Sequence, residues 1–161
     1  MAKNSIFYFA YGSNMLTERL AERCPSAVPL GIATANGYEL SFAKKGADGS
    51  GKATLVKATS DDAIVQGVLF KLAESDVAAL DEVERNYTRD DNFEVDFEQK
   101  TINVTTYIAA EKYCEIGLLP FDWYRDFCLA GAKQHGLDPQ YINQLQALLT
   151  RQGRQNRVQN K

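Results

Sequence analysis

The most constraining feature of the chain is a short apolar run near the N-terminus that stops at a glycine. Residues Ile6–Ala10 are rich in β-branched and aromatic side chains, which is typical of a buried strand. The turn Tyr11–Asn14 follows, and its glycine permits backbone conformations that other residues avoid. Leu16, Leu20 and Cys24 then recur at helical spacing. The N-terminal region is therefore predicted to form a strand, a tight glycine turn and a helix.

The rest of the chain mixes further strands with helices. Apolar and polar residues alternate strictly in Phe93–Phe97 and Ile102–Ala109, as in half-exposed strands. Other strands are predicted at 38–42, 53–58 and 64–69, and helices beginning at Ser75, Pro120 and Asp138. No long linker divides the sequence, so we predict one mixed α and β domain over residues 1–150. Residues 151–161, with four basic and no acidic side chains, are expected to form a disordered tail.

Charge and hydropathy exclude several classes of function. The net charge of −3 gives the chain no general attraction to phosphate backbones, so nucleic acid is not an expected partner. No apolar run approaches the roughly 20 residues that a membrane helix needs, so no membrane partner is expected. The first apolar run is also too short for a secretory signal, and we expect a cytoplasmic protein.

Cysteine and histidine are scarce. The three cysteines stand far apart without a Cys-x-x-Cys pair, so neither a disulfide framework nor a zinc knuckle is predicted. His135 is the only histidine and precedes Gly136 at the predicted end of a helix, where a cation suits the helix dipole. Any catalysis is therefore expected to use carboxylates, hydroxyls and backbone amides, with no metal and no cofactor.

The turn Tyr11–Asn14 is the first candidate site. A glycine turn between a strand and a helix leaves several amide N–H groups pointing one way, and this geometry binds phosphate, carboxylate or a developing oxyanion. The flanking glycines and the Lys-Ser/Thr pair of a phosphate-binding P-loop are missing. The turn therefore indicates an anion site of another kind.

Glu84 is the second candidate. At about 100° per residue, the apolar helical face set by Val77 and Leu80 also contains Glu84, whereas Glu82 points away from it. A buried carboxylate is costly unless it is paired or functional, and burial raises its pKa toward the range useful for proton transfer. The spacing thus favours Glu84 over its neighbour as a general acid or base.

A structural alternative exists for each candidate. The glycine turn can be a simple tight turn in which Ser13 or Asn14 caps the following helix. The last turn of the second helix can emerge into solvent, or Glu84 can pair with Arg85 or Arg89. The residues alone do not decide between these alternatives and a functional site.

Taken in this order, the two candidates resemble the gamma-glutamylcyclotransferase family. The family pattern is an N-terminal Tyr-Gly-Ser-Asn loop followed by a glutamate at the end of a Leu-Asp-x-x-Glu segment, as in Phe9–Met15 and Leu80–Glu84. Leu16–Arg19, Tyr124 and Gly131–Gly136 extend the resemblance over most of the chain. The fold it implies is a small, closed or barrel-like mixed sheet surrounded by helices.

The resemblance also implies an activity and the residues that carry it. The family converts a gamma-glutamyl amino acid to 5-oxoproline and releases the free amino acid, with the substrate's own α-amine as nucleophile. Glu84 would be the catalytic acid and base, and Tyr87 and Tyr124 would contact the substrate. The residues implied to wrap the gamma-glutamyl group are Tyr8, Phe9, Ala10, Tyr11, Gly12, Ser13 and Asn14.

Two departures and two alternative functions accompany the resemblance. The family often has glycine after the catalytic glutamate, where this chain has Arg85 and Asn86. Relatives specific for glutathione carry leucine in place of Asn14, which argues against glutathione as the substrate. The alternatives are a cyclotransferase for gamma-glutamylamines such as a lysine isopeptide, and a non-catalytic binder of a small acidic metabolite. The sequence fits a monomer or a homodimer.

Overall fold

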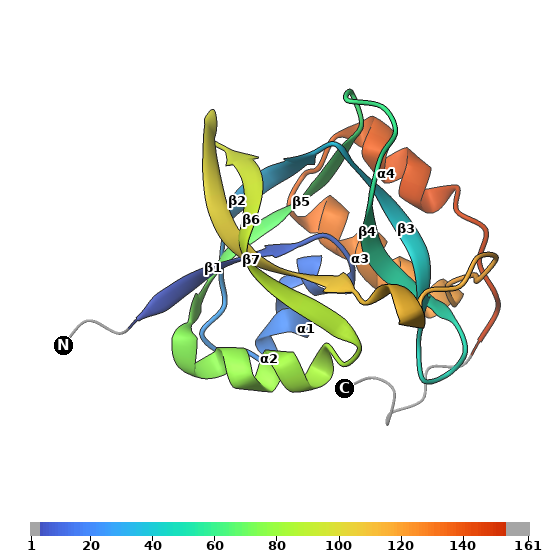
Figure 1. Cartoon of the computed structure of the whole chain (residues 1–161), viewed down its shortest axis with the longest axis horizontal. Coiled ribbons are helices and arrows are strands. Elements are labelled where there is room, and N and C mark those ends of the chain that lie inside the picture. Colours follow the sequence, from blue (N-terminus) through green and yellow to red (C-terminus); the bar gives the residue numbers. More distant parts are fainter. Residues whose placement is uncertain (1–3, 154–161) are drawn as a thin grey trace.

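The computed structural model describes residues 4–153, which form a closed barrel with helices around it (Figure 1). The strands are β1 (Ser5–Ala10), β2 (Val28–Asn36), β3 (Tyr38–Lys45), β4 (Gly51–Lys57), β5 (Ile64–Ala73), β6 (Tyr87–Phe97) and β7 (Lys100–Ala109). The α-helices are α1 (Thr17–Ala21), α2 (Val77–Val83), α3 (Asp122–Gln134) and α4 (Pro139–Gln146). Single 3₁₀ turns η1 (Ser13–Met15), η2 (Glu74–Asp76) and η3 (Glu111–Tyr113) connect them. The predicted mixed α and β class with a barrel-like sheet is confirmed.

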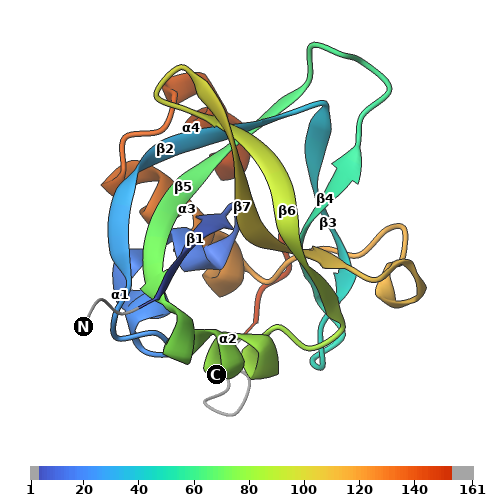
Figure 2. The ribbon, with the colours of Figure 1, turned by 60° about the vertical axis from the view of Figure 1, so that its left-hand side comes forward.

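The barrel strands follow the order β1-β5-β2-β6-β7. Neighbouring strands run antiparallel, and β1 closes the barrel by pairing in parallel with β7 at Tyr8 and Thr105. Strands β3 and β4 form a separate antiparallel hairpin, which stands beside the barrel in Figure 2. Helix α2 lies across one end of the barrel strands in both views.

Two adjoining apolar cores hold β1 in place. Tyr8 packs into one of them with Met15 and Leu80. The neighbouring residue Phe9 is buried in the other core, where its ring stacks on Phe93. Because alternate residues of a strand point to opposite faces, one short strand contributes to both cores. This double anchoring fixes the position at which the glycine turn begins.

The sequence analysis missed β2 and the first part of β6. Strand β2 contains Pro29 and Gly31, which normally argue against a strand, but the register shifts between these two residues and a bulge accommodates them. A second register shift between Asp90 and Phe93 interrupts the alternation of β6. Only the regular half of β6 therefore carried a strand signal.

Helix ends differ in part from the prediction. Asp138 caps α4 as expected, since its carboxylate accepts a hydrogen bond from the Gln140 amide at 2.8 Å. Ser75 is not an N-cap, because it lies inside η2. Gly136 has the positive φ of 71° expected after a helix. His135 is the C-cap residue of α3, as predicted, and burial lowers the pKa of its imidazole.

The predicted tail lies mostly outside the described residues. Its first residue, Arg151, forms a bridge with Phe121, in which the Arg151 amide donates to the Pro120 carbonyl at 2.9 Å. Residues 154–161 are outside the description, so the domain boundary at residue 150 stays a prediction. Within residues 4–153, every helix is too short or too polar to span a bilayer.

Candidate active site

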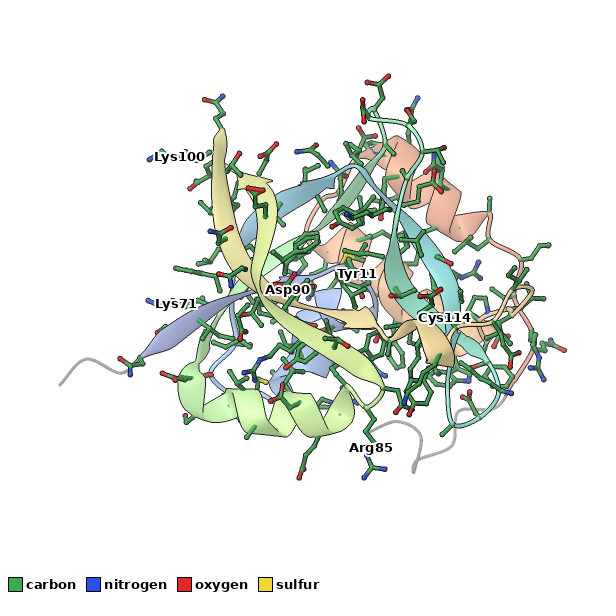
Figure 3. The ribbon with its side chains drawn as sticks, viewed as in Figure 1. Tyr11, Lys71, Arg85, Asp90, Lys100 and Cys114 are labelled. Atoms are coloured by element: carbon green, nitrogen blue, oxygen red, sulfur yellow. The ribbon has the colours of Figure 1, made fainter. Side chains whose placement is uncertain are left out.

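A cavity of about 820 Å³ lies at the loop after β1, the end of α2 and the β3–β4 hairpin. The predicted site residues that line it are Tyr8, Tyr11, Gly12, Ser13, Asn14, Glu84, Tyr87 and Tyr124. In Figure 3, Tyr11 lies inside the molecule, whereas Arg85 points outward from the end of α2. The fold thus joins the two candidate segments in one site.

Two of the predicted site residues do not line this cavity. Phe9 is fully buried, and its ring centroid lies 6.1 Å from that of Phe93. Ala10 is buried in the core that also contains Tyr8. In this structure both residues support the strand that presents Tyr8 and the glycine turn.

Asn14 connects the loop to the candidate acid. Its side-chain amide donates to Glu84 Oε1 at 2.9 Å and approaches the Tyr8 hydroxyl at 3.2 Å. Neither η1 nor α1 has a side-chain cap, and the Ser13 hydroxyl instead accepts a hydrogen bond from Arg19 Nε at 3.1 Å. The capping alternative for this turn is therefore wrong, and Ser13 and Asn14 line the cavity instead.

Glu84 ends α2 with its carboxylate turned into the cavity. Its backbone amide donates to the Leu80 carbonyl at 2.9 Å, which continues the helix to this residue. Glu84 is partly buried, whereas Glu82 is exposed, as the helical spacing predicted. The suggested pairing with Arg89 is wrong, because Arg89 forms ion pairs with Asp81 at 2.7 Å and with Asp91 at 3.2 Å.

Burial sets the protonation behaviour of this carboxylate. It raises the pKa of Glu84 above its ordinary value, while Arg23, Lys44 and the Asn14 amide oppose that rise by stabilising the anion. Burial and the nearby Glu84 charge raise the pKa of the Tyr8 phenol, which keeps this phenol protonated. The cavity therefore holds, in Glu84, a carboxyl whose pKa is raised by burial, beside a Tyr8 phenol that stays protonated near neutral pH.

The two other predicted tyrosines are held by one backbone unit of the hairpin. The Tyr87 hydroxyl donates to the Ala53 carbonyl at 2.7 Å, and the Tyr124 hydroxyl accepts from the Ala53 amide at 3.1 Å. Tyr124 thus keeps its own proton for another acceptor. A Cβ on Gly12 would lie 3.0 Å from the Ala53 Cβ, so a larger residue would crowd the close approach of the loop to the hairpin.

The sequence analysis named none of the basic residues in the cavity wall as a site residue. Seven line the cavity: Arg19, Arg23, Lys44, Lys45, Lys52, Arg85 and Lys112. Arg19 and Lys44 are each only 8% exposed, although both residue types are usually found in solvent. The available signal was weak: Lys44 and Lys52 flank the polar loop between the predicted strands of the hairpin, a place where solvent-exposed lysines are common.

Residues 4–153 contain no group of three or more His, Cys, Asp or Glu side chains placed to hold a metal ion. The expectation of a cofactor-independent reaction remains a prediction.

Comparison with known proteins decides the family. A family model described as gamma-glutamyl cyclotransferase, AIG2-like, matches residues 8–125, the range that contains every predicted site residue. The chain belongs to this family. It is 32% identical to the Homo sapiens gamma-glutamylcyclotransferase over 158 residues, which cover 91% of this chain and 80% of the human protein. The Mus musculus gamma-glutamylcyclotransferase is 32% identical over 156 residues, or 89% and 79% of the two chains.

A solved structure agrees with the sequence relatives. A protein named gamma-glutamyl cyclotransferase superposes with a TM-score of 0.84 at 29% identity, covering 96% of this chain and 95% of that one. The departure after the glutamate is accommodated locally in this member of the family. Asn86 has a positive φ of 69°, a conformation that asparagine tolerates better than most residues, and Arg85 is exposed.

The raised pKa of Glu84 predicts a pH-dependent stability effect. A carboxyl whose folded pKa lies above its unfolded value contributes stability that is present at low pH and is lost as the pH rises through the folded pKa. Replacing Glu84 by Gln removes this loss, so the melting temperature of the variant relative to the parent should be higher at about pH 8 than at about pH 4. Thermal melts of both proteins at the two pH values test this. If the variant and the parent differ in melting temperature by the same amount at both pH values, burial does not raise the pKa of Glu84.

Proposed function

We propose that this chain cyclises gamma-glutamyl amino acids to 5-oxoproline and releases the free amino acid, with Glu84 as the acid and base. The observation that carries the proposal is the contact between the loop and the acid. A partly buried carboxylate is held at 2.9 Å by the Asn14 amide, inside a cavity that also contains the Tyr11–Ser13 turn. Family membership supports the same activity.

In the proposed reaction the substrate supplies the nucleophile. Glu84 takes a proton from the α-ammonium group, and the freed amine attacks the δ-carbonyl carbon of the same molecule. A C–N bond forms, and the carbonyl oxygen becomes an oxyanion. Glu84 then returns the proton to the leaving nitrogen, the original amide C–N bond breaks, and the carbonyl is restored. The attacking nitrogen still carries two protons after the new bond has formed, and it passes one of them through Glu84 to the released amine, so that the products are a neutral lactam and an ammonium group. One carboxyl with a raised pKa serves these transfers, so no enzyme nucleophile is needed.

The loop and the tyrosines are proposed to hold the folded conformer that cyclises. The backbone amides of the turn after β1 would bind the gamma-glutamyl group, and the Tyr124 proton is available to an acceptor on the substrate. Bringing the amine and the carbonyl carbon together in this way removes much of the entropic barrier to ring closure. Tyr87 shapes the same wall through its bond to Ala53.

A direct assay separates this reaction from the two alternatives. The purified protein is incubated with gamma-glutamylalanine and, separately, with gamma-glutamyl-ε-lysine, and the release of 5-oxoproline is followed in each case. Faster release from gamma-glutamylalanine than from the lysine compound supports the proposal. Dominant release from the lysine compound would indicate the isopeptide activity, and binding without any release would indicate a non-catalytic binder.

Substrate choice gives a second prediction. Because Asn14 stands where glutathione-specific relatives carry leucine, we expect gamma-glutamylalanine to be preferred over glutathione by about tenfold or more in kcat/KM, or about 1.4 kcal/mol. Both substrates are supplied together, and the two released products, alanine and cysteinylglycine, are quantified. Equal turnover would show that this loop residue does not set the preference.

A further inference from the structure

The β3–β4 hairpin places two lysines side by side at the cavity. Lys44 and Lys52 are directly opposite each other in the register of the two strands, and both line the cavity. Like charges at directly opposed positions destabilise an antiparallel pair. Surface hairpins usually avoid this arrangement or let both side chains point into solvent. Here Lys44 is only 8% exposed, so its side chain does not simply extend into solvent.

Aromatic rings and one carboxylate hold the lysines in position. Lys52 Nζ lies 4.5 Å from the ring centroid of Tyr124 and 4.7 Å from that of Trp123, and 3.4 Å from Asp48 Oδ2. Lys44 Nζ lies 5.1 Å from the ring centroid of Tyr87. Both ammonium groups are therefore oriented by the same aromatic wall that carries the predicted substrate contacts.

Lys52 lies near two other cations as well as beside Asp48. Burial lowers the pKa of the Lys52 ammonium, its ion pair with Asp48 raises it, and Arg19 and Lys44 lower it. Asp48 is already engaged, since it also accepts hydrogen bonds from the Ser50 amide and hydroxyl. A bound anion would relieve the repulsion among the three cations, so this wall favours a negatively charged group of the ligand.

The positions of the two lysines indicate which group that is. Lys44 lies over the ring of Tyr87, whose backbone amide donates to the Glu84 carbonyl at 3.2 Å, so Lys44 is on the side of the acid. Lys52 instead lies over Tyr124 and Trp123 of α3. In the proposed reaction Glu84 exchanges protons with the attacking nitrogen and with the leaving nitrogen. Each of these nitrogens belongs to an amino acid that carries its own α-carboxylate. In the proposed function the turn after β1 binds the gamma-glutamyl half of the substrate. The aromatic wall with Lys52 is left for the carboxylate of the leaving amino acid.

We propose that Lys52 binds the α-carboxylate of the amino acid that is released, and so selects substrates with a negatively charged leaving group. This inference rests on the proposed function and makes it more specific. Gamma-glutamyl compounds whose leaving amine has no carboxylate would offer no anion to Lys52. The repulsion among Arg19, Lys44 and Lys52 would then remain. Peptides such as glutathione would place their carboxylate one residue farther from the reacting amide.

The test compares two substrates that differ only in this charge. Gamma-glutamylalanine and gamma-glutamylalaninamide are assayed by 5-oxoproline release with the parent protein and with Lys52→Met. For the parent we expect kcat/KM to be about tenfold or more higher for the carboxylate substrate. Lys52→Met should lose about tenfold on that substrate and change by less than about twofold on the amide, so that the preference disappears.

Matched variants keep the result interpretable. Lys57→Met removes the same charge from an exposed position of the same strand and should retain the parental preference. Lys52→Arg keeps the charge and should retain most of the preference. The double variant Asp48→Asn, Lys52→Met leaves no unpaired buried carboxylate, and serves if Lys52→Met folds poorly.

Each other outcome has a definite meaning. An equal loss on both substrates, or no loss on either, would overturn the assignment of Lys52 to the leaving group. Failure of the parent to release 5-oxoproline from any substrate would instead overturn the proposed function, and it would be seen before any variant is compared.

Discussion

Replacing Glu84 by Gln should lower kcat for 5-oxoproline release by about 10²–10⁴-fold, the usual loss when a positioned general acid and base is removed. The amide keeps the size of the side chain, and its carbonyl oxygen can still accept the hydrogen bond that Asn14 donates to Glu84 Oε1. It cannot take a proton from the substrate ammonium. Progress curves for the parent and the variant, with the substrate at saturation, measure the effect. Retention of more than about a tenth of the parental kcat would show that Glu84 does not transfer the proton.

Glu82→Gln is the matched control for this experiment. Glu82 lies in the same helix turn and loses the same charge on substitution, but its side chain is exposed. It should therefore retain parental turnover. Thermal melts exclude unfolding of either variant. If folded Glu84→Gln also fails to bind a gamma-glutamyl ligand, Glu84 acts as a counter-ion for the α-ammonium group instead of moving its proton.

The candidate acid was predictable because local periodicity determines its position. Val77 and Leu80 define the buried face of α2, and a residue seven positions after Val77 returns to that face whatever the rest of the fold does. The glycine turn was predictable for a similar reason, since strand, glycine and helix follow one another locally. The contact between Asn14 and Glu84 was not predictable from spacing, because it joins residues 70 positions apart through the barrel.

The role of the two hairpin lysines, by contrast, could not be predicted from the sequence. Lys44 and Lys52 acquire their significance only from the hairpin register and from the aromatic side chains of α3 and β6 that cover them. Nothing in the local sequence separates them from ordinary surface lysines. Strand β2 was missed for a related reason, since the bulge that tolerates Pro29 and Gly31 depends on its pairing with β5. Features that depend on tertiary partners are those that local patterns do not encode.

The position of the loop that carries Asn14 depends in turn on a glycine far from Glu84 in sequence. Gly131 lies in α3 where this helix crosses the η1 turn. A Cβ at this position would lie 2.5 Å from the Leu16 amide nitrogen and 2.6 Å from the Met15 carbonyl carbon. Both contacts are with backbone, so a side-chain rotation cannot relieve them. The loop that carries Asn14 would have to move away from α3.

Gly131→Ala is therefore expected to lower kcat/KM by about 10²-fold, because displacing a catalytic group by about 1 Å costs that much even when the mutated residue is remote. The free energy of unfolding should fall by about 1–3 kcal/mol through overpacking. A fall in the free energy of unfolding would distinguish this site from an exposed helix, where replacing glycine by alanine stabilises by up to about 1 kcal/mol. Urea unfolding and 5-oxoproline assays measure the two effects. Ala130→Leu, at the neighbouring exposed position, enlarges the helix surface toward solvent and should leave both quantities near parental values. A less stable Gly131→Ala variant with parental kcat/KM would show that α3 does not position the loop, because overpacking would then be relieved away from Asn14 and its hydrogen bond to Glu84.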